Sequence, residues 1–219
     1  LTVGGDDSST SFRGAITGTN GALIKNGTGT LTIGNTGSTF SGGVSLNGGA
    51  IALAAGAALG TGPVTISGGT AIGSVISQRT IPNDLVASGD FTLGVNDQAT
   101  TFNGNIDLGG AARTLTLANS ATFNGVISNG SIVFGAPGSP TARINGTLNG
   151  AVTASNGVTL AGTGTVNGAV VANGILAPGA AATNGTFTGT STVSVPGTAQ
   201  FRLFANGIND KLLVSGGVT

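Results

Sequence analysis

The sequence predicts an all-β fold, a single-stranded parallel β-helix (β-solenoid) in which each coil of the chain lies on the coil before it. Short runs of alternating apolar and small polar residues have the length of minimal β-strands. Gly and Asn-Gly close these runs where the backbone must turn sharply. Because no such strand can bury an apolar face alone, stacked coils that share one core are the expected arrangement.

The N-terminal part contains the clearest strands. Residues 1–3 and 12–16 are strand-like runs on either side of a polar loop. Three further runs follow at 21–33, 40–46 and 49–53, each alternating between aliphatic and small polar side chains. These three runs predict successive strands of stacked coils.

A five-residue pattern, Phe-x-Gly-x-Ile/Val, occurs four times. Its copies begin at Phe12, Phe40, Phe102 and Phe123. Their spacings of 28, 62 and 21 residues fit one, three and one coils of roughly 20 to 30 residues, a period typical of solenoids. We expect the four rings to form an internal stack, because burial of aromatic side chains is strongly favourable. An exposed aromatic stripe for ligands is the alternative.

Four triplets place Thr between two aliphatic residues, at 31–33, 64–66, 115–117 and 158–160. Side chains alternate between the two faces of a strand, so the aliphatic residues share one face and Thr occupies the other. Stacking in parallel predicts an internal aliphatic column and an external Thr ladder.

Thirteen Asn-Gly dipeptides punctuate the chain. Between strands, Asn-Gly is a strong hairpin signal and would favour an antiparallel sandwich or barrel, an alternative that stays open. Asn and Gly suit equally any corner that needs a left-handed residue. The recurring strand types favour coils over hairpins.

Two stretches interrupt the regular pattern. Residues 71–100, which include Gln78 and Arg79, are the most polar part and predict a looser coil or a protruding loop. Pro137 and Pro140 mark an irregular connection, because Pro cannot donate to a sheet ladder.

The whole of 1–219 is expected to be one continuous β-helix, since no flexible linker divides it. Leu1 and Thr219 both fall inside strand-like runs, so we expect a fragment of a longer protein. Gly occurs 42 times, yet the hydrophobic fraction of 39% favours an ordered fold.

Charge, Cys content and the length of apolar runs exclude a basic nucleic-acid-binding surface, disulfide bonds and membrane-spanning helices. Seven Lys plus Arg balance seven Asp, giving a formal net charge of zero and no basic footprint for nucleic acid. Low charge also leaves little repulsion between chains, which permits association. Cys is absent, so there is no disulfide, and the longest apolar runs are too short to cross a bilayer.

The stretch from Gly21 to Leu53 resembles the autotransporter-associated β-strand repeat of type V secretion passengers. The chain departs from that repeat at Phe40, where Tyr is commoner, and at 49–51, where Gly-Ala-Ile replaces Gly-Thr-Leu. The matching residues are Lys25, Gly27, Gly29, Thr30, Leu31 and Ser41-Gly42-Gly43.

Later parts of the chain extend this resemblance. Residues 79–84, 102–104 and 123–128 resemble spacer coils between such repeats, and 160–219 are similar to the C-terminal coils of passengers. The resemblance implies a right-handed parallel β-helix that is exported through a membrane β-barrel and displayed on a Gram-negative cell surface.

The sequence predicts no enzyme, no cofactor and no metal site. Without His and Cys, neither Ser-His-Asp nor Cys-His catalysis is available, and Gly-rich phosphate motifs are absent. Asp84, Asp90 and Asp97 are the acids that could gather for Ca²⁺ binding or sugar cleavage. We favour solvated loop residues instead, because no metal-loop spacing is present.

Two further sets of residues receive structural interpretations. We expect Lys25 to be an external charge that discourages lateral strand pairing. The Asn-x-Ser/Thr pattern is expected by chance among so many Asn-Gly corners, and we assign no sugar to its copies. These are Asn26, Asn129, Asn145 and Asn184.

We therefore expect a structural and adhesive rod of about 8 to 11 coils and about 40 to 50 Å, located outside the cell on a bacterial surface. Expected partners are glycans or proteins of host or neighbouring cells, or like chains. Nucleic acid is not expected, and contact with a membrane is expected only through a C-terminal β-barrel beyond this sequence. Residues 71–100 are the expected contact region. The alternatives are a self-assembling extracellular fibre or surface-layer element and, less favoured, a carbohydrate-active β-helix.

Overall fold

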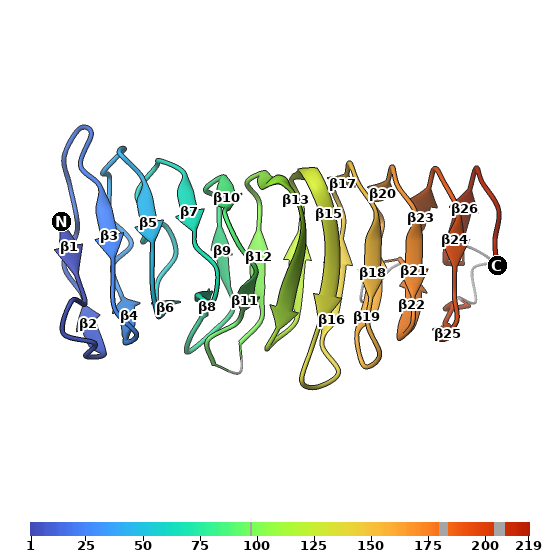
Figure 1. The fold of residues 1–219 in the computed structure, drawn as a ribbon, viewed down its shortest axis with the longest axis horizontal. Coiled ribbons are helices and arrows are strands. Elements are labelled where there is room, and N and C mark those ends of the chain that lie inside the picture. The colour runs from blue at the N-terminus through green and yellow to red at the C-terminus, as the bar shows by residue number, and fades with distance from the viewer. Residues whose placement is uncertain (97, 180–183, 204–208) are drawn as a thin grey trace.

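The computed structural model describes residues 1–96, 98–179, 184–203 and 209–219. Over these residues the chain is all-β, without helices, and forms a parallel β-solenoid of about 10 turns. Figure 1 shows a rod with the two termini at opposite ends and the strands stacked in sequence order. At about 4.8 Å per coil the rod is about 48 Å long. The predicted parallel β-helix is confirmed.

The first ladder of parallel strands runs the length of the rod. The opening residues of β13 and β15 belong to it, and their later residues belong to the second ladder. Its strands are β1 (Thr2–Val3), β3 (Leu23–Lys25), β5 (Val44–Leu46), β7 (Val64–Ile66), β10 (Leu85–Ala87), β13 (Ile106–Leu117), β15 (Val126–Gly135), β17 (Thr147–Leu148), β20 (Thr165–Val166), β23 (Thr186–Gly189) and β26 (Lys211–Val214).

The second ladder shares β13 and β15 with the first and is also parallel. Its other strands are β2 (Thr10–Phe12), β4 (Thr30–Ile33), β6 (Ala50–Leu53), β8 (Ala71–Ser74), β11 (Phe91–Leu93), β18 (Val152–Ala154), β21 (Val170–Ala172) and β24 (Val193–Ser194).

The third ladder begins later along the rod. In the earlier coils single backbone bonds hold this side together, for example from the Thr61 amide to the Phe40 carbonyl at 2.9 Å. Its strands are β9 (Arg79–Ile81), β12 (Thr100–Phe102), β14 (Ala121–Phe123), β16 (Thr141–Ile144), β19 (Thr159–Gly162), β22 (Ile175–Pro178) and β25 (Thr198–Ala199). Because all of these strand pairs are parallel, the antiparallel sandwich or barrel is wrong.

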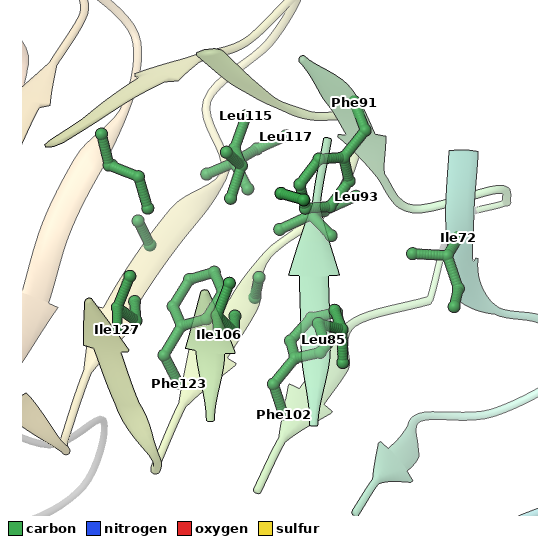
Figure 2. Packing of buried hydrophobic residues seen from close by; sticks show 14 of the residues in the cluster. Ile72, Leu85, Phe91, Leu93, Phe102, Ile106, Leu115, Leu117, Phe123 and Ile127 are labelled. Carbon is green, nitrogen blue, oxygen red and sulfur yellow. The ribbon is translucent and has the colours of Figure 1, made fainter. Parts of the chain in front are cut away.

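The core follows from the alternation of side chains along each short strand. Leu85, Ile106 and Ile127 pair in register from coil to coil and are each 1% exposed. Figure 2 shows them beside the rings of Phe102 and Phe123. Each coil thus buries the apolar face of its neighbour, which supplies the hydrophobic stabilisation that one strand lacks.

The predicted Phe stack is confirmed for part of the set. Phe102 pairs with Phe123 in the third ladder, and their rings stack. Phe40 is also buried and lies on the same side of the rod, in a segment without a strand. Phe12 is different: it lies in β2 of the second ladder and is 38% exposed, so its place in the internal stack was wrong.

The side chains of the Thr triplets lie on the predicted faces of their strands, but the four triplets do not stack in one column. In each triplet the aliphatic side chains are buried and Thr is half-buried. Thr65 lies in the first ladder, Thr32 and Thr116 in the second, and Thr159 in the third. A single external Thr ladder is therefore wrong, because side-chain alternation fixes the face and not the ladder.

In the described part of the polar stretch 71–100, that is, all of it except residue 97, strands replace the expected looser coil or protruding loop. It contributes β8 to β11 and the start of β12 to the three ladders. Its buried polar residues find partners in neighbouring coils: Ser74 bonds to Thr100, and Asn83 Nδ2 donates to the carbonyl oxygens of Gly60 and Gly62. In contrast, 136–140 joins β15 to β16 without a strand, so the irregular connection at Pro137 and Pro140 is confirmed.

Glycine at the corners has a reason that the sequence did not reveal. A Cβ on Gly125 would lie 2.2 Å from the Gly104 carbonyl oxygen, and one on Gly146 would lie 2.0 Å from that of Gly125. Neither Gly125 nor Gly146 has a positive φ. Close approach of stacked coils, rather than left-handed geometry, requires glycine at these corners.

Candidate functional site

Two of the three acids named as candidate ligands, Asp84 and Asp90, accept hydrogen bonds from backbone amides of neighbouring coils. Asp84 Oδ1 accepts a hydrogen bond from the Asn105 amide at 2.7 Å, and Asp90 Oδ1 accepts one from the Thr114 amide at 2.9 Å. Asp97 lies outside the described residues. Among the described residues, no three acidic side chains come together as metal ligands.

Lys25 is not the external charge that we expected. It is 1% exposed, and its Nζ donates to the carbonyl oxygens of Asn26, Gly27 and Gly48 at 2.5, 3.0 and 3.3 Å. Burial lowers the pKa of Lys25, partly opposed by the negative charge of Asp7. These carbonyls replace water around the ammonium, which is how a strand position facing the core can hold a charge.

Asn side chains form hydrogen-bonded ladders at two outer corners of the rod. Asn124 Nδ2 donates to Asn103 Oδ1 at 2.8 Å, and Asn145 Nδ2 donates to Asn124 Oδ1 at 3.1 Å, each across 21 residues. At the corner that follows the first-ladder strands, Asn167 Nδ2 donates to Asn149 Oδ1 at 2.7 Å. These amides connect one coil to the next, as in other stacked parallel strands.

The outer side of the third ladder carries a hollow that is lined partly by charged and polar side chains. The hollow has a volume of about 260 Å³, and we call it the Arg143 groove. The side chains fall into two Arg, three neutral polar residues and a small-residue floor. The lining residues are Thr141, Arg143, Thr159, Ala161, Ala177, Gly179, Gln200 and Arg202.

Strand register explains the shape of the Arg143 groove. Arg143 pairs with Ala161, and Ala161 pairs with Ala177 one coil further on. Their neighbours Leu160 and Leu176 point into the core, so these three residues face outward. Gln200 follows in the next coil, since Ala199 pairs with Leu176. Two alanines between larger side chains leave the hollow.

Arg143 lies across this floor. Its Nη1 donates to the carbonyl oxygen of Gly179 at 3.0 Å, 36 residues along the chain. Burial lowers the pKa of Arg143, and the positive charge of Arg202 lowers it further. Among the described residues, no carboxylate forms an ion pair with Arg143. Its guanidinium therefore keeps unused donors and an uncompensated charge beside the hollow.

Arg202 also lines the groove and forms an ion pair with Asp210. Its Nε lies 2.8 Å from Asp210 Oδ2. Burial alone would raise the pKa of Asp210, but hydrogen bonds from Arg202 and its charge outweigh this, so the pKa is lowered. A Cβ on Gly179 would lie 2.1 Å from Asp210 Oδ1 and 2.8 Å from Arg202 Nη2. Gly179 is thus the point where both Arg side chains converge.

Sequence analysis did not single out Arg143 or Arg202. The alternation in 141–144 places Arg143 on an outer face, but only the coil-to-coil register brings Ala161 and Ala177 beside it. That register depends on the number of residues in each coil: 18 residues separate Arg143 from Ala161, and 16 separate Ala161 from Ala177. The available sequence signal was therefore an outward Arg without a neighbouring acid.

Comparisons with known proteins give no relative for this chain: no family, no curated protein and no solved structure matches it. Within the described ranges, no helix has the length and apolar character needed to span a membrane.

Proposed function

We propose that the chain is part of the passenger region of an autotransporter, displayed on or secreted from a Gram-negative cell as a structural and adhesive stalk. The observation that carries the proposal is the long, regular solenoid whose outer faces present neutral hydroxyl and amide groups from coil to coil. Such a rod holds a repetitive polar surface at a distance from its point of attachment.

The residues that resemble the autotransporter repeat support this proposal. They correspond to β3 and β4 stacked on β5 and β6, with Leu23 against Val44 and Leu31 against Ile51. The resembling segment is thus a pair of consecutive coils. Glycans and proteins on host or neighbouring cells are the proposed partners.

Two measurements test the proposal. Antibodies raised against the purified chain are expected to stain intact cells of the source bacterium, and staining only after permeabilisation would contradict surface display. Beads coated with the folded chain are expected to attach to host cells or to cells of the same bacterium. Attachment no greater than that of albumin-coated beads would contradict adhesion.

Self-assembly is a second candidate function, favoured by apolar surface at the ends of the rod. A hollow of about 220 Å³ near the N-terminus is lined by Leu1, Phe12 and Ile16, among others. At the other end, Leu212 and Val214 of the last strand, β26, pack against the core and are only half-buried. End-to-end stacking of like chains would bury both surfaces. Analytical ultracentrifugation over a range of concentrations tests this, and a constant monomer contradicts it.

A further inference from the structure

The Arg143 groove has the composition of a binding site for a small anionic ligand. Arg143 supplies a positive charge that no described carboxylate neutralises. Its guanidinium donates one hydrogen bond to the Gly179 carbonyl oxygen. The remaining donors form the planar fork that recognises oxyanions. Arg202, although paired with Asp210, adds positive potential at the same place.

The other lining residues indicate that the ligand carries hydroxyl groups as well as a negative charge. Thr141 and Thr159 lie side by side in register, and Gln200 borders the floor. Their hydroxyl and amide groups can donate and accept hydrogen bonds, which a ligand with several hydroxyls would use. The lining contains no aromatic ring on which a neutral sugar could stack. The affinity of the groove for a ligand must therefore come from charge.

Size restricts the ligand further. The volume of about 260 Å³ lies below the range of about 300–1,000 Å³ that is typical of pockets for drug-sized ligands. The side chain of Arg143 crosses Ala161, which is 3% exposed, so the open floor of the groove is the half-buried Ala177, which has room for one sugar ring at most.

We infer that the Arg143 groove binds a sugar acid, with the carboxylate on the guanidinium of Arg143 and the ring hydroxyls on Thr141, Thr159 and Gln200. This inference rests on the proposed adhesive function, because it names the chemical class of the ligand. It places recognition on the outer side of the third ladder, between β16 and β25.

Isothermal titration of the purified chain with glucuronate tests the inference. Glucuronate is expected to bind, whereas glucose, which lacks the carboxylate, is expected to bind at least 10-fold more weakly. Binding is expected to weaken as salt rises, because the contact is electrostatic and partly exposed. Sodium sulfate forms a third arm: sulfate that binds as tightly as glucuronate shows a simple anion site and overturns the assignment to a sugar.

Matched variants locate the ligand. Arg143→Gln is expected to weaken glucuronate binding by about 10- to 100-fold, the usual effect of losing a charge-assisted contact. Arg13→Gln removes an equal charge from an exposed position near the N-terminus and is expected to leave binding unchanged. Equal effects of these two variants, or no effect of Arg143→Gln, would overturn the inference.

A third variant separates binding from stability. Ala177→Leu keeps every charge and fills the floor of the groove, so it is expected to abolish glucuronate binding while thermal unfolding followed by circular dichroism remains cooperative. Retained binding in this folded variant would overturn the inference. Adhesion of coated beads without glucuronate binding would refute the sugar acid alone, whereas glucuronate binding by a chain absent from the cell surface would refute the proposed display alone.

Discussion

The rings of Phe102 and Phe123 stack one coil apart, with centroids separated by 5.5 Å and planes inclined by 12°. The Phe123 ring also stacks on Phe134, from the second ladder, at 5.5 Å. Phe123 therefore joins two ladders across the core as well as two coils along the rod.

Truncation of this ring is expected to be costly. Phe123→Ala should lower the free energy of unfolding by about 3–5 kcal/mol. The substitution leaves a cavity in the core, and the backbone ladders prevent the neighbouring coils from moving inward to fill it. Urea denaturation followed by circular dichroism measures the change. Phe12→Ala is the matched control, since Phe12 is 38% exposed at the end of the rod. A cost for Phe12→Ala as large as that for Phe123→Ala would contradict the assigned packing.

Because the coils stack closely at the corners, adding a single methyl group there is expected to lower the free energy of unfolding. Gly125→Ala places a Cβ 2.2 Å from the Gly104 carbonyl oxygen, and we expect a loss of about 1–3 kcal/mol from the resulting overpacking. Gly138 lies in the connection between β15 and β16, with nothing within 4 Å of an added Cβ. Gly138→Ala is expected to change stability by less than about 0.5 kcal/mol. Similar denaturation midpoints for the two variants would refute the steric explanation.

The buried Lys25 predicts a difference between two lysines. Lys25→Ala leaves the carbonyls of Asn26, Gly27 and Gly48 without the ammonium, and we expect it to cost about 2–3 kcal/mol. Lys211→Ala, on an exposed residue of β26, should change stability by less than about 0.5 kcal/mol. Chemical denaturation of both variants gives the comparison. Equal stabilities would return Lys25 to the role of a surface charge.

The ion pair beside the Arg143 groove predicts a dependence on acid. The pKa of Asp210 is lower in the folded chain than its ordinary value of 3.8. The ionised carboxylate therefore contributes stability above about pH 4, and this contribution is lost as pH falls through the folded pKa. Asp210→Asn should be less stable than the natural chain at pH 7, and the difference should shrink below pH 3.8. Thermal melting from pH 7 to pH 2 tests this, and a constant difference would contradict it.

Some features of the fold could be predicted from particular residues. The alternation in Leu31-Thr32-Ile33 assigned the buried and outer faces correctly, because side-chain period two is a local property of any strand. The repeated Phe-x-Gly pattern at Phe102 and Phe123 predicted two rings in register, which the structure confirms. The same pattern failed at Phe12, which belongs to a different ladder.

The candidate site could not be predicted in the same way. Lys25 alternates with Leu23 and so occupies a position facing the core, but one of the carbonyl oxygens that accept its hydrogen bonds belongs to Gly48 in the next coil. Arg143 acquires its groove from two alanines supplied by later coils. In both cases the decisive contacts join residues from different coils.

By itself, the sequence determined that this chain forms short strands with one apolar face, which bury that face by stacking in parallel. Only the tertiary structure decided which ladder each strand joins, where a charge is solvated by backbone carbonyls, and where two arginines meet over a floor of alanine. The physical reason is that alternation along a strand is local, whereas coil-to-coil register depends on the length of every corner between the strands.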